Sequence, residues 1–198
     1  MLERRPISRA AALVLVLVLV VLLALAAAGC SGDDGDGEQG QAQEVLQRGL
    51  QAHVLGDLET AEQLYLEVIR LDAQNKFAYY NLGVIDHGRG DLETAEERYR
   101  TALGIDADFV AALFNLAILR TALGDDDEAI DLYRHIIELE PENAAAHLNL
   151  GFVLIAKGFE ARGQAELEEA IRLDPSLEGR VGPETSTPEP ATESPNPV

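Results

Sequence analysis

Apolar and small residues recur along most of this chain with a step of 34 positions. The segment YYNLGVIDHGRGD at Tyr79 returns as LFNLAILRTALGD at Leu113 and as HLNLGFVLIAKGF at His147. A weaker copy, VLQRGLQAHVLGD, begins at Val45. Units of equal length therefore follow one another without insertions, at 42–75, 76–109, 110–143 and 144–177. Self-similarity at this period indicates a solenoid of helical repeats.

The pattern inside each unit predicts two helices joined by a tight turn. The fifteenth place holds glycine, which favours the left-handed conformation that ends many helices: Gly56, Gly90, Gly124 and Gly158. Three of these are followed by an aspartate that can cap the next helix: Asp57, Asp91 and Asp125. Small residues recur where the two helices approach each other: Gly49, Gly83, Ala117, Gly151, Ala61, Ala95, Ala129 and Gly163. Large residues recur to fill the remaining space: Tyr65, Tyr99, Tyr133 and Leu167.

This framework resembles the tetratricopeptide repeat. That family has Leu-Gly near the middle of the first helix, an alanine and an aromatic residue in the second, and a proline near the end of the unit. The matching residues here are NLG at 81–83, Ala95, Tyr99, Ala129, Tyr133 and Pro141. The tryptophan that the family often has early in the unit is absent. The resemblance covers residues 42–175 and implies an all-α fold, a right-handed α-solenoid of four helix-turn-helix repeats.

The N-terminal segment has a different character from the repeats. A basic start, MLERRPISR, precedes an unbroken small and apolar run at 10–29, and Cys30, the only cysteine, follows. This order is typical of an export signal, although about 20 apolar residues can also span a bilayer. The residues AAAGC resemble the lipobox of bacterial lipoproteins, which implies that 1–29 is a cleaved signal peptide and that Cys30 carries a lipid. An uncleaved transmembrane anchor is the alternative.

The distribution of charge predicts where the chain lies. Basic residues precede the apolar run and acidic residues follow it, so we expect the repeats on the outer side of the cytoplasmic membrane, in the cell envelope. Residues 30–41 are rich in Gly and Asp and are predicted to form a flexible acidic linker. Residues 176–198, rich in Pro, Ser, Thr and Glu, are predicted to form a disordered tail.

Composition and motifs argue against several classes of function. The formal net charge of −20 argues against a nucleic-acid partner, because phosphate backbones require a basic face. We find no nucleophile motif or phosphate-binding loop, and predict neither enzymatic activity nor a cofactor. The four histidines are too dispersed for a metal site and are expected to be solvated or at the edge of the groove: His53, His87, His135 and His147.

By resemblance, the first helices of the units line a concave groove with their second, fifth, sixth, ninth and twelfth places. The candidate peptide-binding residues are Gln47, Asn81, Asn115 and Asn149 at the sixth place, Tyr80, Phe114 and Leu148 at the fifth, Val84, Ile118 and Phe152 at the ninth, and His53 and His87 at the twelfth. The fifth and ninth places share one helix face and form an apolar stripe. The amides can donate to and accept from the backbone of a peptide. Alternatively, each asparagine bonds a neighbouring helix or water.

These features predict a membrane-tethered scaffold or adaptor that binds an extended or helical segment of an envelope protein. The segment is expected to be mostly apolar, with basic flanks attracted by the acidic charge. A clamp for a terminal carboxylate is not supported, because the chain has only Lys76 and Lys157 as lysines. The alternative is a protein that oligomerises through its last helix in pilus, secretion or wall-synthesis assembly, without a groove ligand. There Leu167, Ile171 and Leu173 have no following unit to cover them.

Overall fold

The structure is a computed structural model that describes residues 36–181. The predicted signal peptide or anchor, Cys30 and the residues from 182 onward lie outside this range. The α-helices are α2 (Asp36–Val54), α3 (Leu58–Leu71), α4 (Lys76–Arg89), α5 (Leu92–Ile105), α6 (Val110–Ala122), α7 (Asp126–Leu139), α8 (Ala144–Ala156) and α9 (Glu160–Leu173). A short 3-10 helix, η1 (Pro175–Arg180), follows them. The described residues contain no strand, and the predicted all-α solenoid of four helix pairs is confirmed.

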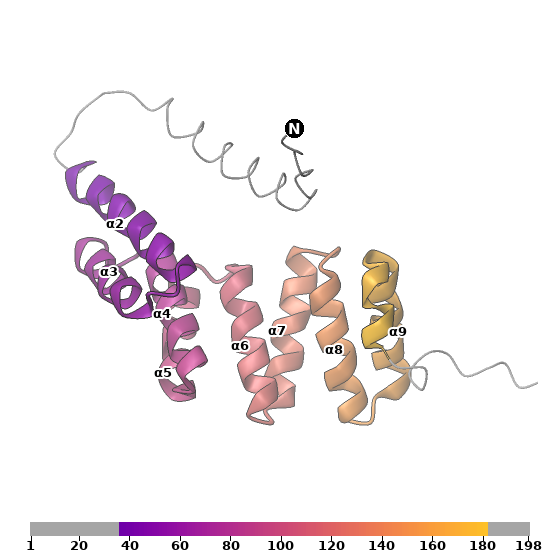
Figure 1. Ribbon diagram of the computed structural model, residues 1–198. Helices are drawn as coiled ribbons and strands as arrows, with labels where there is room; N and C mark the ends of the chain where they lie inside the picture. The colour runs from indigo at the N-terminus through magenta and orange to yellow at the C-terminus, as the bar shows by residue number, and fades with distance from the viewer. Residues whose placement is uncertain (1–35, 182–198) are drawn as a thin grey trace, which may run out of the picture. The chain divides into compact units, whose positions relative to one another are not determined.

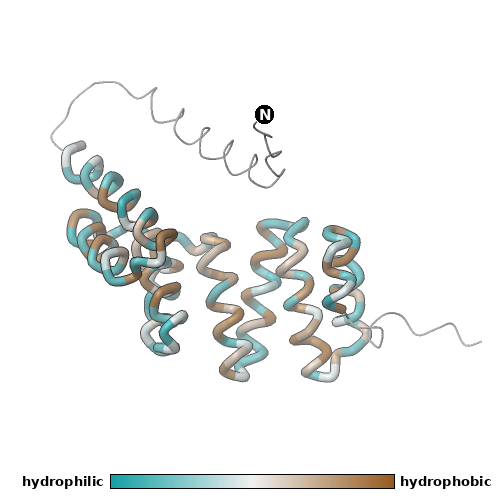
Figure 2. Tube along the Cα trace, in the orientation of Figure 1, coloured by the Kyte–Doolittle hydropathy of each residue, from teal (hydrophilic) through white to brown (hydrophobic). Residues whose placement is uncertain are grey.

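The pairs α2–α3, α4–α5, α6–α7 and α8–α9 follow one another in chain order (Figure 1). Hydrophobic and hydrophilic residues alternate along each helix in short steps rather than in long blocks (Figure 2). Each helix therefore buries one side against its neighbours, as expected for amphipathic helices in a repeat array.

The predicted turn within each unit is present. Gly90 ends α4 in the left-handed conformation with φ 83°, and its N–H donates to the carbonyl of His87 at 3.0 Å. The same conformation recurs at Gly56, Gly124 and Gly158. The next residue then caps the second helix: the carboxylate of Asp91 accepts a hydrogen bond from the N–H of Thr94.

One predicted cap is wrong. The side chain of Asp125 accepts no capping hydrogen bond at the start of α7, although Asp57 and Asp91 cap the equivalent helices. The carboxylate of Asp125 pairs instead with the guanidinium of Arg120. A full positive charge is a stronger partner for a carboxylate than a neutral backbone N–H, which explains the difference.

The core of each unit depends on close approach between its two helices. Tyr99 is fully buried, and a Cβ atom placed on Gly83 would lie 2.7 Å from its ring. In the fourth unit the large residue is Leu167, which is smaller than tyrosine, and the helices come closer together. A Cβ atom on Gly163 would lie 2.6 Å from the carbonyl oxygen of Gly151. The predicted role of these small residues in helix packing is therefore confirmed.

The buried tyrosines predict a loss of stability at alkaline pH. Burial raises the pKa of Tyr65 to about 12, and it also raises the pKa of Tyr99 and Tyr133 above the ordinary value of 10.0. These tyrosines therefore have a higher pKa in the folded protein than in the unfolded chain. The stabilising contribution is therefore fully present below about pH 10 and is lost as pH rises toward the folded pKa. Urea unfolding at a series of pH values should show the free energy of unfolding falling above about pH 10.

A matched pair of variants tests this prediction. Tyr99→Phe should make the alkaline decline shallower, because it removes one raised pKa. It breaks no hydrogen bond between described residues, since the buried Tyr99 hydroxyl has no partner there. Tyr79→Phe, at a half-buried position, is the control. A decline with the same slope in both variants would contradict the assignment to buried tyrosine.

Two predicted boundaries are wrong by several residues. The linker was expected to reach residue 41, but α2 begins at Asp36 and continues without a break into Ala42, Val45 and Leu46, which are buried in the core. The tail was expected to begin at 176, but η1 continues through 180 and Val181 is buried. Val181 packs in one cluster with residues of α8 and α9, so this segment has apolar surface to bury.

Candidate functional site

One side of the first helices carries the predicted peptide-binding residues. We call the second, fifth, sixth, ninth and twelfth places of the four units the first-helix face; they lie on α2, α4, α6 and α8. The predicted residues that are half-buried on this face are His53, Tyr80, Asn81, Val84, His87, Phe114, Asn115, Ile118 and Asn149. Gln47 and Phe152 are exposed. These side chains retain surface for contact with another molecule.

Leu148 does not belong to this accessible set. Its side chain is fully buried, in a cluster with Leu167, Ala170 and Val181. Residues of η1 and Val181 cover it where a fifth unit would otherwise pack. They also pack against Leu167 and Ile171, which had been expected to lack a covering unit. The prediction of Leu148 as a peptide contact is therefore wrong, because the chain itself occupies that position.

The sixth-place amides do not all make the same contact. The Nδ2 atom of Asn81 donates to the carbonyl oxygen of Phe77 at 2.7 Å, and Nδ2 of Asn149 donates to that of Ala145 at 2.8 Å. Both acceptors lie one turn earlier on the same helix. Asn115 instead donates from Nδ2 to the Tyr80 hydroxyl at 3.1 Å and so joins α6 to α4. Each asparagine thus already uses one amide hydrogen within the protein.

Aromatic rings gather where α4 meets the start of α6. The Phe109 ring makes edge-to-face contacts with Tyr80 at 5.3 Å and with Phe77 at 5.4 Å between centroids. Tyr80 in turn lies 6.1 Å from the buried ring of Tyr99. Phe77 is 46% exposed, so this cluster has a free surface. Partly exposed aromatic residues that pack against buried neighbours are often hot spots of protein interfaces.

Lys76 lies against the same rings. Its Nζ atom is 5.1 Å from the centroid of Phe77 and 4.8 Å from that of Phe109, and it forms an ion pair with Asp106. The hydrogen bond from Lys76 lowers the pKa of the Asp106 carboxyl. The structure thus holds one of its own cations between aromatic faces and a carboxylate, the arrangement that stabilises a cation over a π-system.

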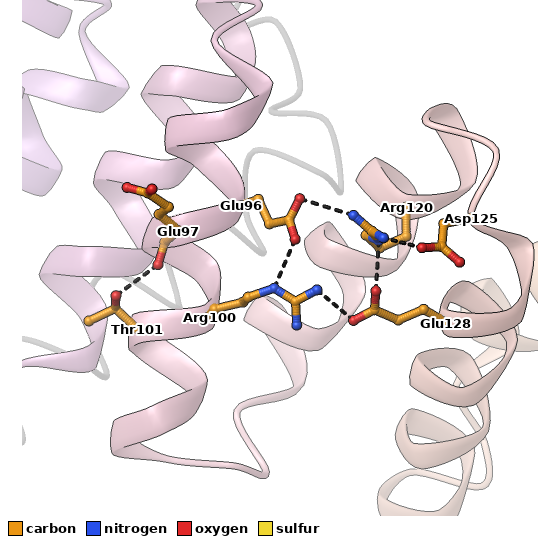
Figure 3. A network of polar contacts seen from close by, with 7 residues as sticks. All are labelled: Glu96, Glu97, Arg100, Thr101, Arg120, Asp125 and Glu128. Atoms are coloured by element: carbon orange, nitrogen blue, oxygen red, sulfur yellow. Dashed lines mark hydrogen bonds and ion pairs between the residues drawn. The ribbon is translucent and has the colours of Figure 1, made fainter.

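Charged residues avoid the first-helix face and gather on the second helices. Within the described helices, no lysine, arginine, aspartate or glutamate occupies a place of the first-helix face. Outside it, Glu96, Arg100, Arg120 and Glu128 alternate in a closed ring that Asp125 joins through Arg120; we call these five the charge network (Figure 3). Its N–O distances include 2.9 Å from Arg100 to Glu96 and 2.8 Å from Arg120 to Glu128. The network connects α5, α6 and α7.

A family model for the cilia and flagella-associated protein 70 middle TPR-like domain matches residues 46–174. The chain belongs to the tetratricopeptide-repeat family. The match runs from within α2 to the end of α9, so it includes every place of the first-helix face except Gln43. No curated protein matches the chain.

Solved structures share the tetratricopeptide fold. The crystal structure of MamA is 18% identical over 74% of this chain and 98% of its own, with a TM-score of 0.63. PilF of Pseudomonas aeruginosa is 23% identical over 75% of this chain and 66% of its own, with a TM-score of 0.63. A tetratricopeptide repeat protein of Parabacteroides merdae is 23% identical over 68% of this chain and 54% of its own, with a TM-score of 0.61. Likeness at these identities shows the fold alone.

The histidines of this tetratricopeptide array have structural contacts. His53 lies within hydrogen-bond distance of the Tyr65 hydroxyl, at 3.3 Å. His147 was expected to be solvated or at the groove edge but is buried, with Nδ1 2.6 Å from the carboxylate of Glu166 and Nε2 3.1 Å from the carbonyl of Pro141. Within residues 36–181, no group of three or more His, Cys, Asp or Glu side chains is arranged so that it could hold a metal ion. In the same range no helix has the length and apolar character needed to cross a membrane.

Two aromatic residues of the tetratricopeptide site were not among the predicted contacts. Phe77 occupies a second place, a position already expected to face the groove, so its residue type alone was a usable signal. Phe109 is the last residue of the unit that begins at Lys76, and it contacts α4 only because the chain returns to this helix after α5. That contact joins residues far apart in the chain and leaves no local pattern.

Proposed function

We propose that this tetratricopeptide protein is a membrane-tethered scaffold that binds a segment of a partner protein on its first-helix face. The tetratricopeptide fold supports a role in protein–protein interaction. The observation that carries the proposal is the composition of this face. It combines aromatic rings, aliphatic side chains and amides, carries no lysine, arginine, aspartate or glutamate, and apart from Leu148 its residues on α4, α6 and α8 remain half-buried or exposed.

The face suits a protein ligand better than a small molecule. Its amides recur once in each of three successive units, at Asn81, Asn115 and Asn149, and are therefore spread over several helices. Partly accessible apolar side chains precede two of these amides, Tyr80 before Asn81 and Phe114 before Asn115. Repeat arrays use such extended surfaces to hold elongated segments, with anchor side chains in apolar positions and polar groups that set the orientation.

Site-specific photocrosslinking in cells that produce the full chain tests this surface. A photoreactive residue at Ala145, which is exposed on the first-helix face, should give protein adducts. The same residue at Asp131, exposed on α7, is the control and should give few. Asn81→Ala combined with Asn149→Ala should reduce the Ala145 adducts while the helical signal and the melting temperature survive. Equal adducts from both positions would exclude the first-helix face as the binding surface.

The proposed tether is a lipid on Cys30, which places the repeats on the outer side of the cytoplasmic membrane. The support is the order of the N-terminal residues: a basic segment, an apolar run, small residues and then the cysteine. Mass spectrometry of the protein from its native cells is the test. A chain that begins at a lipid-modified Cys30 is the expected result, and an uncleaved, unmodified N-terminus would rule it out.

A further inference from the structure

We infer that the partner segment is cationic, with lysine or arginine side chains lying over the aromatic cluster and donating hydrogen bonds to the sixth-place amide oxygens. The aromatic cluster is Phe77, Tyr80 and Phe109, and the oxygens are Oδ1 of Asn81 and Asn149. This inference rests on the proposed function, because it names the chemistry of the segment that the first-helix face takes.

The first argument is the direction of the amides. Nδ2 of Asn81 and of Asn149 faces a main-chain carbonyl at 2.7 and 2.8 Å, and a carbonyl oxygen can only accept. The nitrogen must therefore point back at its own helix. Since the two amide atoms lie on opposite sides of Cγ, Oδ1 points away from that helix backbone. An incoming segment thus meets an acceptor, which is suited to the N–H groups of lysine or arginine.

The second argument is the position of Lys76. The structure already places an ammonium group about 5 Å from the centroids of Phe77 and Phe109, next to the carboxylate of Asp106. This shows that a cation is compatible with these rings and their surroundings. Phe77 is 46% exposed, so part of the ring remains available to a second cation from outside.

The third argument is charge. The places of the first-helix face hold no lysine or arginine, and the charge of Lys76 beside it is balanced by the carboxylate of Asp106. Arg100 and Arg120 lie in the charge network, where carboxylates neutralise them. The chain as a whole carries 35 acidic against 15 basic residues, a net charge of −20. Such a field attracts basic segments, speeds their association and disfavours acidic ones.

Binding of synthetic peptides to the full chain, followed by fluorescence anisotropy, tests the inference. The probes are peptides of equal length in which leucine is interspersed with lysine, with glutamine or with glutamate. The lysine peptide should bind about tenfold more tightly than the glutamine peptide, and the glutamate peptide more weakly than both. A lysine peptide that binds no better than the glutamine peptide overturns the cationic assignment.

Variants separate contact at the face from attraction by net charge. Phe77→Ala leaves the net charge of the protein unchanged and should lower its affinity for the lysine peptide about fivefold. Asn81→Asp with Asn149→Asp should raise the affinity for the lysine peptide, because the same positions then offer charged acceptors. Gln63→Glu with Gln74→Glu, which adds two carboxylates at exposed positions outside the first-helix face, is the matched control and should change affinity less than twofold. Unchanged affinity in Phe77→Ala, or weaker binding in the Asp variant, would overturn the inference.

The outcome is read together with the photocrosslinking experiment. If Ala145 gives adducts but the lysine peptide binds no better than the glutamine peptide, the proposed scaffold function stands and the cationic nature of its ligand is excluded. If Ala145 gives no adducts, the proposed binding function of the first-helix face is contradicted, and so is the inference that rests on it.

Discussion

Replacing Gly163 by alanine is expected to lower the free energy of unfolding by about 2 kcal/mol. The added Cβ atom would lie 2.6 Å from the carbonyl oxygen of Gly151 and 2.6 Å from Cγ1 of Ile155. A side chain can turn aside, but the backbone of Gly151 cannot move without separating α8 from α9. The earlier units have Ala61, Ala95 and Ala129 at this place, each fully buried in a unit whose large residue is tyrosine rather than leucine.

Gly104→Ala is the matched control. Gly104 lies in α5, and a Cβ atom there would meet nothing within 4 Å. Its replacement should leave stability unchanged or raise it by up to about 1 kcal/mol through helix propensity. Urea unfolding followed by far-UV circular dichroism measures both variants. A Gly163→Ala variant as stable as the parent would show that the two helices of the last unit can separate at little cost.

Arg120→Ala is expected to lower the free energy of unfolding by about 2 kcal/mol. Arg120 is only 17% exposed, and its guanidinium pairs with Glu96, Asp125 and Glu128. Removal of this side chain leaves these carboxylates close together, and only Arg100 still compensates two of them. This loss is smaller than that for a fully buried ion pair, because water reaches part of the charge network.

Arg70→Ala provides the comparison for Arg120→Ala. Arg70 pairs with Glu67 one turn away on α3, but its side chain is 65% exposed. Exposed pairs of this kind contribute little, so we expect no measurable change in stability. Urea, which is uncharged, is the appropriate denaturant, and added salt should reduce the deficit of Arg120→Ala by screening the remaining carboxylates. Equal losses in both variants would show that burial of the network has no energetic role.

The fold could be predicted because its requirements are visible as residue types at fixed places. Only glycine reaches φ near 80° without strain, so Gly56, Gly90, Gly124 and Gly158 marked the turns. Small residues opposite large ones marked the helix contacts in the same way. Asp125 shows the limit of such reasoning. Its residue type fits a cap, but a competing arginine five positions earlier decided its partner.

The candidate site could be predicted only in outline. The sequence places Asn81, Asn115 and Asn149 on one face, but it does not show which amide atom points outward. That direction depends on whether a main-chain carbonyl or the Tyr80 hydroxyl is the nearer acceptor. Leu148 is apolar like Tyr80 and Phe114 at the same place, but the chain itself covers it. Contacts between units and at the last unit have no signature within a single 34-residue pattern.

The position of Val181 shows how such an array can grow. Val181 stands 34 residues after His147, where a further unit would have its fourth place. Together with η1 it covers the α8–α9 pair, where the first helix of a further unit would pack. Duplication of one whole unit would carry the same covering segment to the new last pair. Whole units can therefore be added to or removed from this protein without a separate domain to cover the last helix pair.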